Sequence, residues 1–141
     1  MNKALYVFTD GGAKGNPGPA AIGFVVKDSS GKVLIEQGKA IGIATNNVAE
    51  YQAVIEALKW VKENIKYEIA NINFFLDSKL VVNQLNSFFK VKNKNLRNLI
   101  IEVKGLEQEI GRKIFYHFIP REKNKKADFL VRTATPAVTI P

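Results

Sequence analysis

The chain lacks cysteine altogether and contains a single histidine among its 141 residues. The absence of cysteine excludes a disulfide framework, a thiolate metal site and a cysteine nucleophile. It also agrees with a reducing compartment. The one histidine, His117, falls in a predicted strand, where a lone histidine packs or faces solvent more often than it catalyses.

Long apolar runs are missing too. No run approaches the roughly 18 residues that a membrane span requires, and the first residues lack the charged-then-apolar pattern of a secretory signal. We therefore expect a cytoplasmic protein that does not bind membranes. The chain shows no internal repeat and no low-complexity segment. We expect a monomer with a single domain over residues 1–141, in which residues 135–141 form an apolar tail.

Positive charge exceeds negative charge. Lys and Arg number 21, Asp and Glu number 13, and the formal net charge is +8. A basic balance favours polyanionic partners such as nucleic acid. Other basic proteins carry such a charge only for solubility, so charge alone leaves the partner open.

Hydrophobic periodicity predicts an α/β protein. The first three strands follow one another through short turns, which predicts an antiparallel meander. Strands then alternate with helices, which predicts a parallel crossover. Strands are expected at 4–10, 20–27, 32–41, 72–76 and 113–119, and helices at 48–64, 79–85, 95–110 and 127–134.

Two of the apolar strands end on a carboxylate, Asp10 and Asp77. The strand before Asp10 is apolar enough to be buried on both faces. An ionised carboxylate there requires a cationic side chain, several N–H donors or a divalent cation, because its desolvation costs several kcal/mol. Ligands of parallel sheets bind at the carboxyl ends of strands, which is where Asp77 is expected.

Two further acids, Glu50 and Asp128, lie in the first turns of amphipathic helices. The first of these helices is expected to have Asn46 or Asn47 as its N-cap. The helix dipole accounts for an acid in a first turn, but it does not explain why Glu50 lies on the inward stripe. If the four acids converge, their repulsion raises their pKa values unless cations are bound. Hard divalent cations suit such oxygen ligands, and carboxylate clusters of this kind run two-metal phosphodiester chemistry.

Three loops leave alternatives open. Residues 11–19 include four glycines and two prolines but no P-loop signature, so they form either an ordinary turn or a backbone that a ligand approaches closely. Residues 88–94 combine lysines with two phenylalanines, which either contact nucleic acid or pack inward. Residues 121–126 form a charged loop that is either solvated or in contact with phosphate.

Four separate blocks carry a resemblance to a known family. In the order of the chain they are Thr9-Asp10-Gly11-Gly12 with residues 15–19, Thr45-Asn46-Asn47-Val48-Ala49-Glu50, Leu76-Asp77-Ser78, and residues 120–122 with 124–128. Over nearly its whole length the chain resembles type 1 ribonuclease H. The resemblance implies a mixed five-stranded sheet with helices on both faces, and endonucleolytic cleavage of the RNA strand in RNA–DNA hybrids to 5′-phosphate and 3′-OH ends.

The resemblance also implies which residues act. Asp10, Glu50, Asp77 and Asp128 are the implied ligands of two Mg²⁺ or Mn²⁺ ions. The implied contacts with the hybrid come from the glycine loop and the block before Glu50. These contact residues are Gly11, Gly12, Asn16, Thr45, Asn46 and Asn47.

The chain departs from the family pattern in three places. Lys79 stands where relatives often have a glutamine that contacts RNA, and we place it among the substrate-binding candidates. The long basic insertion that many bacterial members carry after the second helix is absent. Affinity for the hybrid is therefore expected from other basic residues, which are Lys90, Lys92, Lys94, Arg97, Arg121, Lys123, Lys125 and Lys126. The loop before Asp128 contains no histidine, and we predict that Arg121 partly takes over its role in releasing the leaving group or product.

Two other functions compete with this prediction. One is a hybrid-binding module without catalysis, which would gain nothing from four acids facing phosphates. The other is a related nuclease that cuts double-stranded RNA or DNA. The glycine loop and the Thr45–Asn47 block favour the hybrid as substrate.

Overall fold

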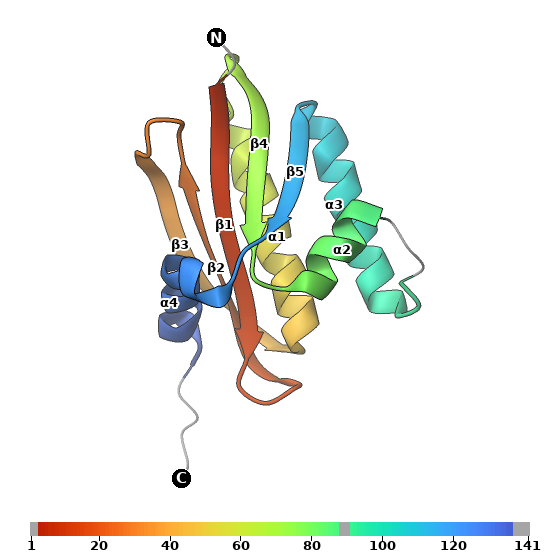
Figure 1. Cartoon of the computed structure of the whole chain (residues 1–141). Coiled ribbons are helices and arrows are strands. Elements are labelled where there is room, and N and C mark those ends of the chain that lie inside the picture. Colours follow the sequence, from red (N-terminus) through yellow and green to blue (C-terminus); the bar gives the residue numbers. More distant parts are fainter. Residues whose placement is uncertain (1–2, 88–90, 137–141) are drawn as a thin grey trace.

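The computed structural model describes residues 3–87 and 91–136. The chain forms five strands and four α-helices within this part, with one short 3₁₀ helix, η1 (Figure 1). The strands are β1 (Lys3–Ala13), β2 (Gly18–Lys27), β3 (Val33–Ala44), β4 (Ile69–Leu76) and β5 (Lys113–Phe118). The helices are α1 (Asn46–Asn64), α2 (Lys79–Ser87), α3 (Lys94–Ile110), η1 (Arg121–Lys123) and α4 (Lys125–Ala134).

The five strands form one mixed sheet in the order β3-β2-β1-β4-β5. The pairs β1–β2 and β2–β3 are antiparallel, which confirms the predicted meander. The pairs β1–β4 and β4–β5 are parallel, which confirms the crossover. Because β1 and β4 are parallel neighbours, their carboxyl ends lie at the same edge of the sheet.

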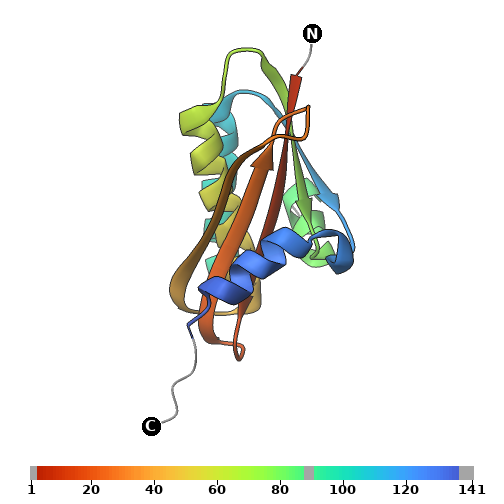
Figure 2. The ribbon, with the colours of Figure 1, turned by 90° about the vertical axis from the view of Figure 1, so that its left-hand side faces the viewer.

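Helices cover both faces of this sheet. On one face α1 packs against β1 and β2, and α3 packs against α1; on the other face α4 lies on β2, β3 and β1 (Figures 1 and 2). The core lies between α1 and the sheet, where the predicted stripe of Val54, Leu58 and Val61 is fully buried. No helix in the described ranges is long and apolar enough to cross a membrane.

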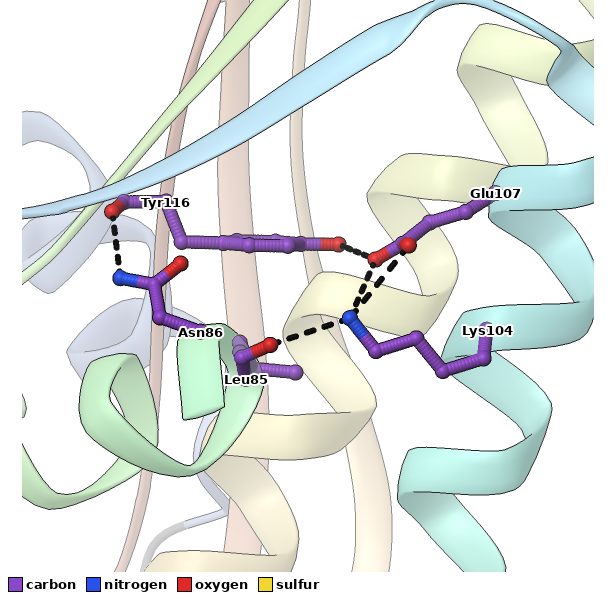
Figure 3. Close-up of polar contacts among 5 residues, drawn as sticks. All are labelled: Leu85, Asn86, Lys104, Glu107 and Tyr116. Carbon is purple, nitrogen blue, oxygen red and sulfur yellow. Dashed lines mark hydrogen bonds and ion pairs between the residues drawn. The ribbon is translucent and has the colours of Figure 1, made fainter. Parts of the chain in front are cut away.

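A partly buried polar network joins α2, α3 and β5 (Figure 3). The Tyr116 hydroxyl donates to the Glu107 carboxylate at 2.6 Å, and the Lys104 ammonium donates to the Leu85 carbonyl at 3.0 Å and to Glu107. The Asn86 amide donates to the Tyr116 carbonyl at 3.1 Å. The network fixes the far end of α2, the helix that begins directly after Asp77 and Ser78.

The predicted helix ends need one correction. The N-cap of α1 is Thr45, whose hydroxyl accepts from the Val48 N–H at 3.2 Å, and not Asn46 or Asn47. The end of α3 at residue 110 is confirmed, and Gly111 follows it in the left-handed conformation at φ 68°. The Ser78 hydroxyl caps α2 by accepting from the Val81 N–H at 3.3 Å.

The apolar composition of β1 predicts a strand that is buried on both faces. In the structure only one face is fully buried. Leu5, Val7 and Thr9 are buried towards α1, whereas Tyr6 and Phe8 are half-buried on the opposite face. Four strands are longer than predicted, whereas β5 ends one residue earlier than predicted. The strand β1 continues past Asp10 through both glycines while pairing with β2. Two other predictions, on Phe88 to Lys90 and on the tail beyond residue 136, lie outside the described residues.

Candidate active site

Three of the predicted acids lie together at the carboxyl-terminal edge of β1 and β4. Asp10 is in β1, and Asp77 directly follows β4. Glu50 projects from the second turn of α1 and not from the predicted first turn, because the helix begins at Asn46. One carboxylate oxygen of each residue lies within 4.8 Å of the others. Three oxygens at this separation can hold a divalent cation.

Burial and mutual repulsion perturb the titration of this cluster. Asp10 and Glu50 are each only 7 % exposed. Burial raises the pKa of Asp10 to about 6, and the charges of Asp77 and Asp128 raise it too. Burial and the charge of Asp10 raise the pKa of Glu50 well above its ordinary value. Without a cation, the pair of Asp10 and Glu50 therefore keeps a proton at pH values at which isolated carboxylic acids are already ionised.

The fourth acid, Asp128, lies beside this cluster in the first turn of α4. Its carboxylate accepts from the Arg132 guanidinium at 3.2 Å, one turn along the helix. Asp128 and the cluster share a cavity of about 530 Å³. The lining of this cavity includes Gly11, Gly12, Lys14, Asn46, Asn47, Ser78, Arg121 and Arg132.

Comparisons with known proteins decide the family. A family model described as "Reverse transcriptase-like" matches residues 8–134. Ribonuclease HI of Haemophilus ducreyi is 33 % identical over 121 residues, which cover 83 % of this chain and 74 % of that protein. The chain belongs to the type 1 ribonuclease H family.

Solved ribonuclease H1 structures have the same fold. The compost-derived LC11-RNase H1 superposes with a TM-score of 0.88 at 39 % identity, covering 96 % of each chain. The same protein has been crystallised in complex with an RNA/DNA hybrid, and that structure matches with a TM-score of 0.84 over 93 % of this chain and 96 % of the other.

Relatives in this family differ in length. The bifunctional protein Rv2228c of Mycobacterium tuberculosis is 41 % identical over 134 residues, and this match covers 94 % of the chain. The chain spans only 36 % of the length of that mycobacterial protein.

The glycine loop of this ribonuclease H-like chain is tied to the start of α1 by two asparagines. The Asn46 side-chain oxygen accepts from the Ala13 N–H, and the Asn16 side-chain oxygen accepts from the Asn46 N–H, each at 2.9 Å. Asn46 and Asn47 line the cavity, whereas Asn16 and Thr45 are absent from its lining. These ties fix the loop against the helix that holds Glu50.

Gly11 allows a close approach, but the group that approaches is protein backbone. A Cβ atom at this position would lie 2.2 Å from the Ala49 carbonyl oxygen and 2.6 Å from the Glu50 nitrogen. The absence of a side chain therefore lets α1 pack directly on β1. This contact brings Glu50 to Asp10.

The two cationic candidates lie in different places. Arg121, at the start of η1, is exposed and lines the cavity of the acids. Lys79 does not line that cavity, and its ammonium lies 5.2 Å from the centre of the Phe118 ring.

Sequence reasoning missed one buried residue of this site. The Asn124 side chain is 1 % exposed, and its amide donates to the Thr9 carbonyl at 2.8 Å and to Asp77 Oδ2 at 3.1 Å. Asn124 therefore holds the start of α4 against both strands that carry acids. It stands four residues before Asp128, but periodicity predicts no partner for a polar residue in a charged loop. Lys14 and Arg132 also line the cavity, and periodicity does not predict this either.

Proposed function

We propose that the chain is an endonuclease that hydrolyses the RNA strand of RNA–DNA hybrids with two divalent cations, Mg²⁺ or Mn²⁺, and leaves 5′-phosphate and 3′-OH ends. The observation that carries the proposal is the set of three converging carboxylates in a cavity shared with Asp128. Membership of the ribonuclease H family supports the reaction, and the hybrid bound to LC11-RNase H1 supports the substrate.

The residues fit divalent cations. Glu50 Oε2 is buried and has no hydrogen-bond partner among the described residues, so this oxygen is available as a ligand. Burial, together with repulsion among the acids, raises the pKa values of Asp10 and Glu50, and a bound cation would favour their charged forms. In this proposal Asp10, Glu50, Asp77 and Asp128 hold the two ions.

Each acid has a distinct place in the reaction. When bound, the cations would activate a water molecule and stabilise charge on the leaving oxygen of the phosphodiester. Asp10, on the central strand, would be a ligand of the bound cations. Glu50 approaches from α1, on the side where it can also orient the RNA 2′-OH, the group that distinguishes RNA from DNA.

The substrate-facing residues extend this cavity along the glycine loop. Gly11, Gly12, Asn46 and Asn47 line the cavity and are proposed to contact the hybrid. We propose that Asn16 and Thr45 lie near a phosphate of the DNA strand, and that Lys79 contacts the RNA strand from the start of α2.

Arg121 is proposed to assist release of the leaving group or product. It lines the cavity and brings a permanent positive charge to it. Arg121→Ala should lower kcat about tenfold or more at saturating hybrid, while Arg121→Lys should retain part of the rate. Undiminished turnover in Arg121→Ala would remove this role.

Cleavage of an end-labelled RNA–DNA hybrid in Mg²⁺ tests the proposal. The wild type should cut the RNA strand, and chelation should stop cleavage. Asp10→Asn should be inactive because it removes a charged ligand while preserving the shape of the side chain. Glu63→Gln changes an exposed acid of α1 and should cut like the wild type.

The competing functions give different results in the same assay. A chain that binds the hybrid but never cuts it with Mg²⁺ or Mn²⁺ is a binding module. A chain that cuts double-stranded RNA or DNA in preference to the hybrid is another nuclease of this fold.

A further inference from the structure

The face of the sheet opposite α1 carries a continuous row of rings. Within the described ranges, α4 packs on β1, β2 and β3 on this face, and the upper part of β4 and β5 is open towards the viewer in Figure 1. The rings come from three neighbouring strands, β1, β4 and β5. We call them the aromatic row: Tyr6, Phe8, Phe75, His117 and Phe115.

Stacking contacts connect the row from one strand to the next. The centre of the Phe75 ring lies 4.9 Å from that of Phe8 and 6.3 Å from that of Tyr6 on β1. On β5 it lies 5.2 Å from His117, which lies 6.4 Å from Phe115. All four ring pairs are within 28° of parallel. Phe115 is 45 % exposed and His117 is exposed, so the row is accessible on β5.

Basic and amide groups flank this row. The Lys27 ammonium lies 5.4 Å from the centre of the Phe8 ring. Lys113 is exposed and shares the face of Phe115 and His117, because side chains alternate along β5. The Asn73 side-chain oxygen lies 3.0 Å from His117 Nε2. The row thus has a cation towards each end, and the Asn73 amide of β4 beside His117.

We propose that the aromatic row is a second nucleic-acid site, which binds a single strand. Aromatic side chains on a sheet bind bases irrespective of sequence, and flanking lysines neutralise the phosphates. Cations and amides around exposed rings complement such a ligand. A second copy of this chain would instead bring two molecules of charge +8 together. The inference rests on the proposed function only for the class of its partner, since none of these rings lines the cavity of the acids.

Binding of a fluorescent oligothymidylate of about 15 nucleotides tests the site by anisotropy. DNA alone avoids cleavage, and EDTA removes any contribution of metal at the acids. The double change Lys113→Glu with Phe115→Ala should weaken binding about tenfold or more, because it removes a phosphate contact and a ring. Lys27→Glu should reduce the slope of log K against log salt by about 0.7.

The matched control is Lys59→Glu, the same change of charge at an exposed residue of α1, on the opposite side of the sheet. It should leave affinity within about twofold of the wild type. An equal loss in this control would overturn the proposal, since it would show binding by net charge alone. Unchanged binding in the double variant would overturn it too, as would a change confined to self-association.

Cleavage of a blunt RNA–DNA hybrid separates this inference from the proposed function. The double variant should cut that substrate like the wild type, which also shows that it is folded. If the wild type binds oligothymidylate through the row but never cuts the hybrid, the proposed function fails and the second site stands. If it cuts the hybrid but does not bind oligothymidylate, the second site fails alone.

Discussion

Asn124 is the residue that joins the two halves of the candidate site. Its buried amide contacts the Thr9 carbonyl and the Asp77 carboxylate, while its own side-chain oxygen has no partner among the described residues. A donor to Asp77 orients that carboxylate. The side chain thus positions a proposed ligand without being one itself.

Asn124→Ala should therefore weaken cation binding and cleavage together. We expect a loss of about 10- to 100-fold in Mn²⁺ affinity and in kcat/KM, with about 1–3 kcal/mol of lost stability because the Thr9 carbonyl loses its donor. Calorimetric titration with Mn²⁺ and thermal melting separate the two effects. Wild-type Mn²⁺ affinity in a folded Asn124→Ala protein would refute the positioning role.

The buried acids make the stability of the cation-free protein depend on pH. The pKa of Asp10 is about 6 when folded, above its ordinary value of 3.8, and that of Glu50 is raised as well. Between pH 3.8 and about pH 6 the folded state therefore binds more protons than the unfolded state. The contribution of these bound protons to the free energy of unfolding is complete below about pH 4 and is lost as pH rises through about 6.

The melting temperature in EDTA should accordingly fall between pH 4 and pH 7, by about 5 °C. Asp10→Asn should flatten this dependence, and Mg²⁺ added at neutral pH should raise the melting temperature of the wild type. Calorimetric scans across pH measure both effects. A wild-type melting temperature that rises over this interval would contradict the assignment.

At the scale of elements, two glycines set the distance between α4 and the sheet. A Cβ atom on Gly23 would lie 2.7 Å from the Ala127 carbonyl oxygen and 2.8 Å from the Leu130 Cβ. One on Gly38 would lie 2.7 Å from the Leu130 carbonyl oxygen. Because Asp128 is on the same helix, this spacing also places the fourth acid.

Gly23→Ala should push α4 outward, at a cost of about 1–3 kcal/mol in unfolding free energy, and should reduce cleavage by displacing Asp128. Gly105→Ala is the matched control, because a Cβ there meets nothing within 4 Å on the exposed side of α3. That change should stabilise the protein by about 0.5–1 kcal/mol. Urea unfolding and hybrid cleavage test the pair, and equal stabilities would refute the packing argument.

Sequence patterns predict the elements better than the contacts between them. The stripe of Val54, Leu58 and Val61 identifies the inward face of α1, because a helix repeats every 3.6 residues. The same periodicity cannot tell that Thr45 and not Asn46 caps the helix, since both residue types are good caps. Asn46 is instead engaged with the Ala13 N–H, a contact between segments that are 33 residues apart.

Sequence patterns predict part of the candidate site. Strand ends and the inward stripe bring Asp10, Asp77 and Glu50 to one edge once the sheet order is assumed. The short turns and the order of the elements predict the meander and the crossover, but neither they nor the implied mixed sheet gives the complete strand order. The amide of Asn124 was unpredictable, since a buried asparagine in a charged loop looks like any solvated residue.

At the scale of the whole molecule, the excess of positive charge should govern affinity for the hybrid. Lys14, Arg121 and Arg132 line the cavity of the acids. If each contacts a phosphate, the logarithm of the binding constant should fall with the logarithm of salt concentration with a slope of about −3 or steeper. Lys14→Ala should make the slope shallower by about 1, and Lys59→Ala should not change it. Binding that is independent of salt would refute phosphate contact.

The hydrogen bond from Asn124 to the Thr9 carbonyl joins residues that are 115 positions apart. During translation, at about 5–20 residues per second, Asp10, Glu50 and Asp77 are made well before Asn124, which lies between η1 and α4. A growing chain can pair its first strands, but it cannot complete the cavity until residues 124–128 have been made. If the chain is the nuclease proposed above, a chain that stops before residue 124 should not cleave the hybrid.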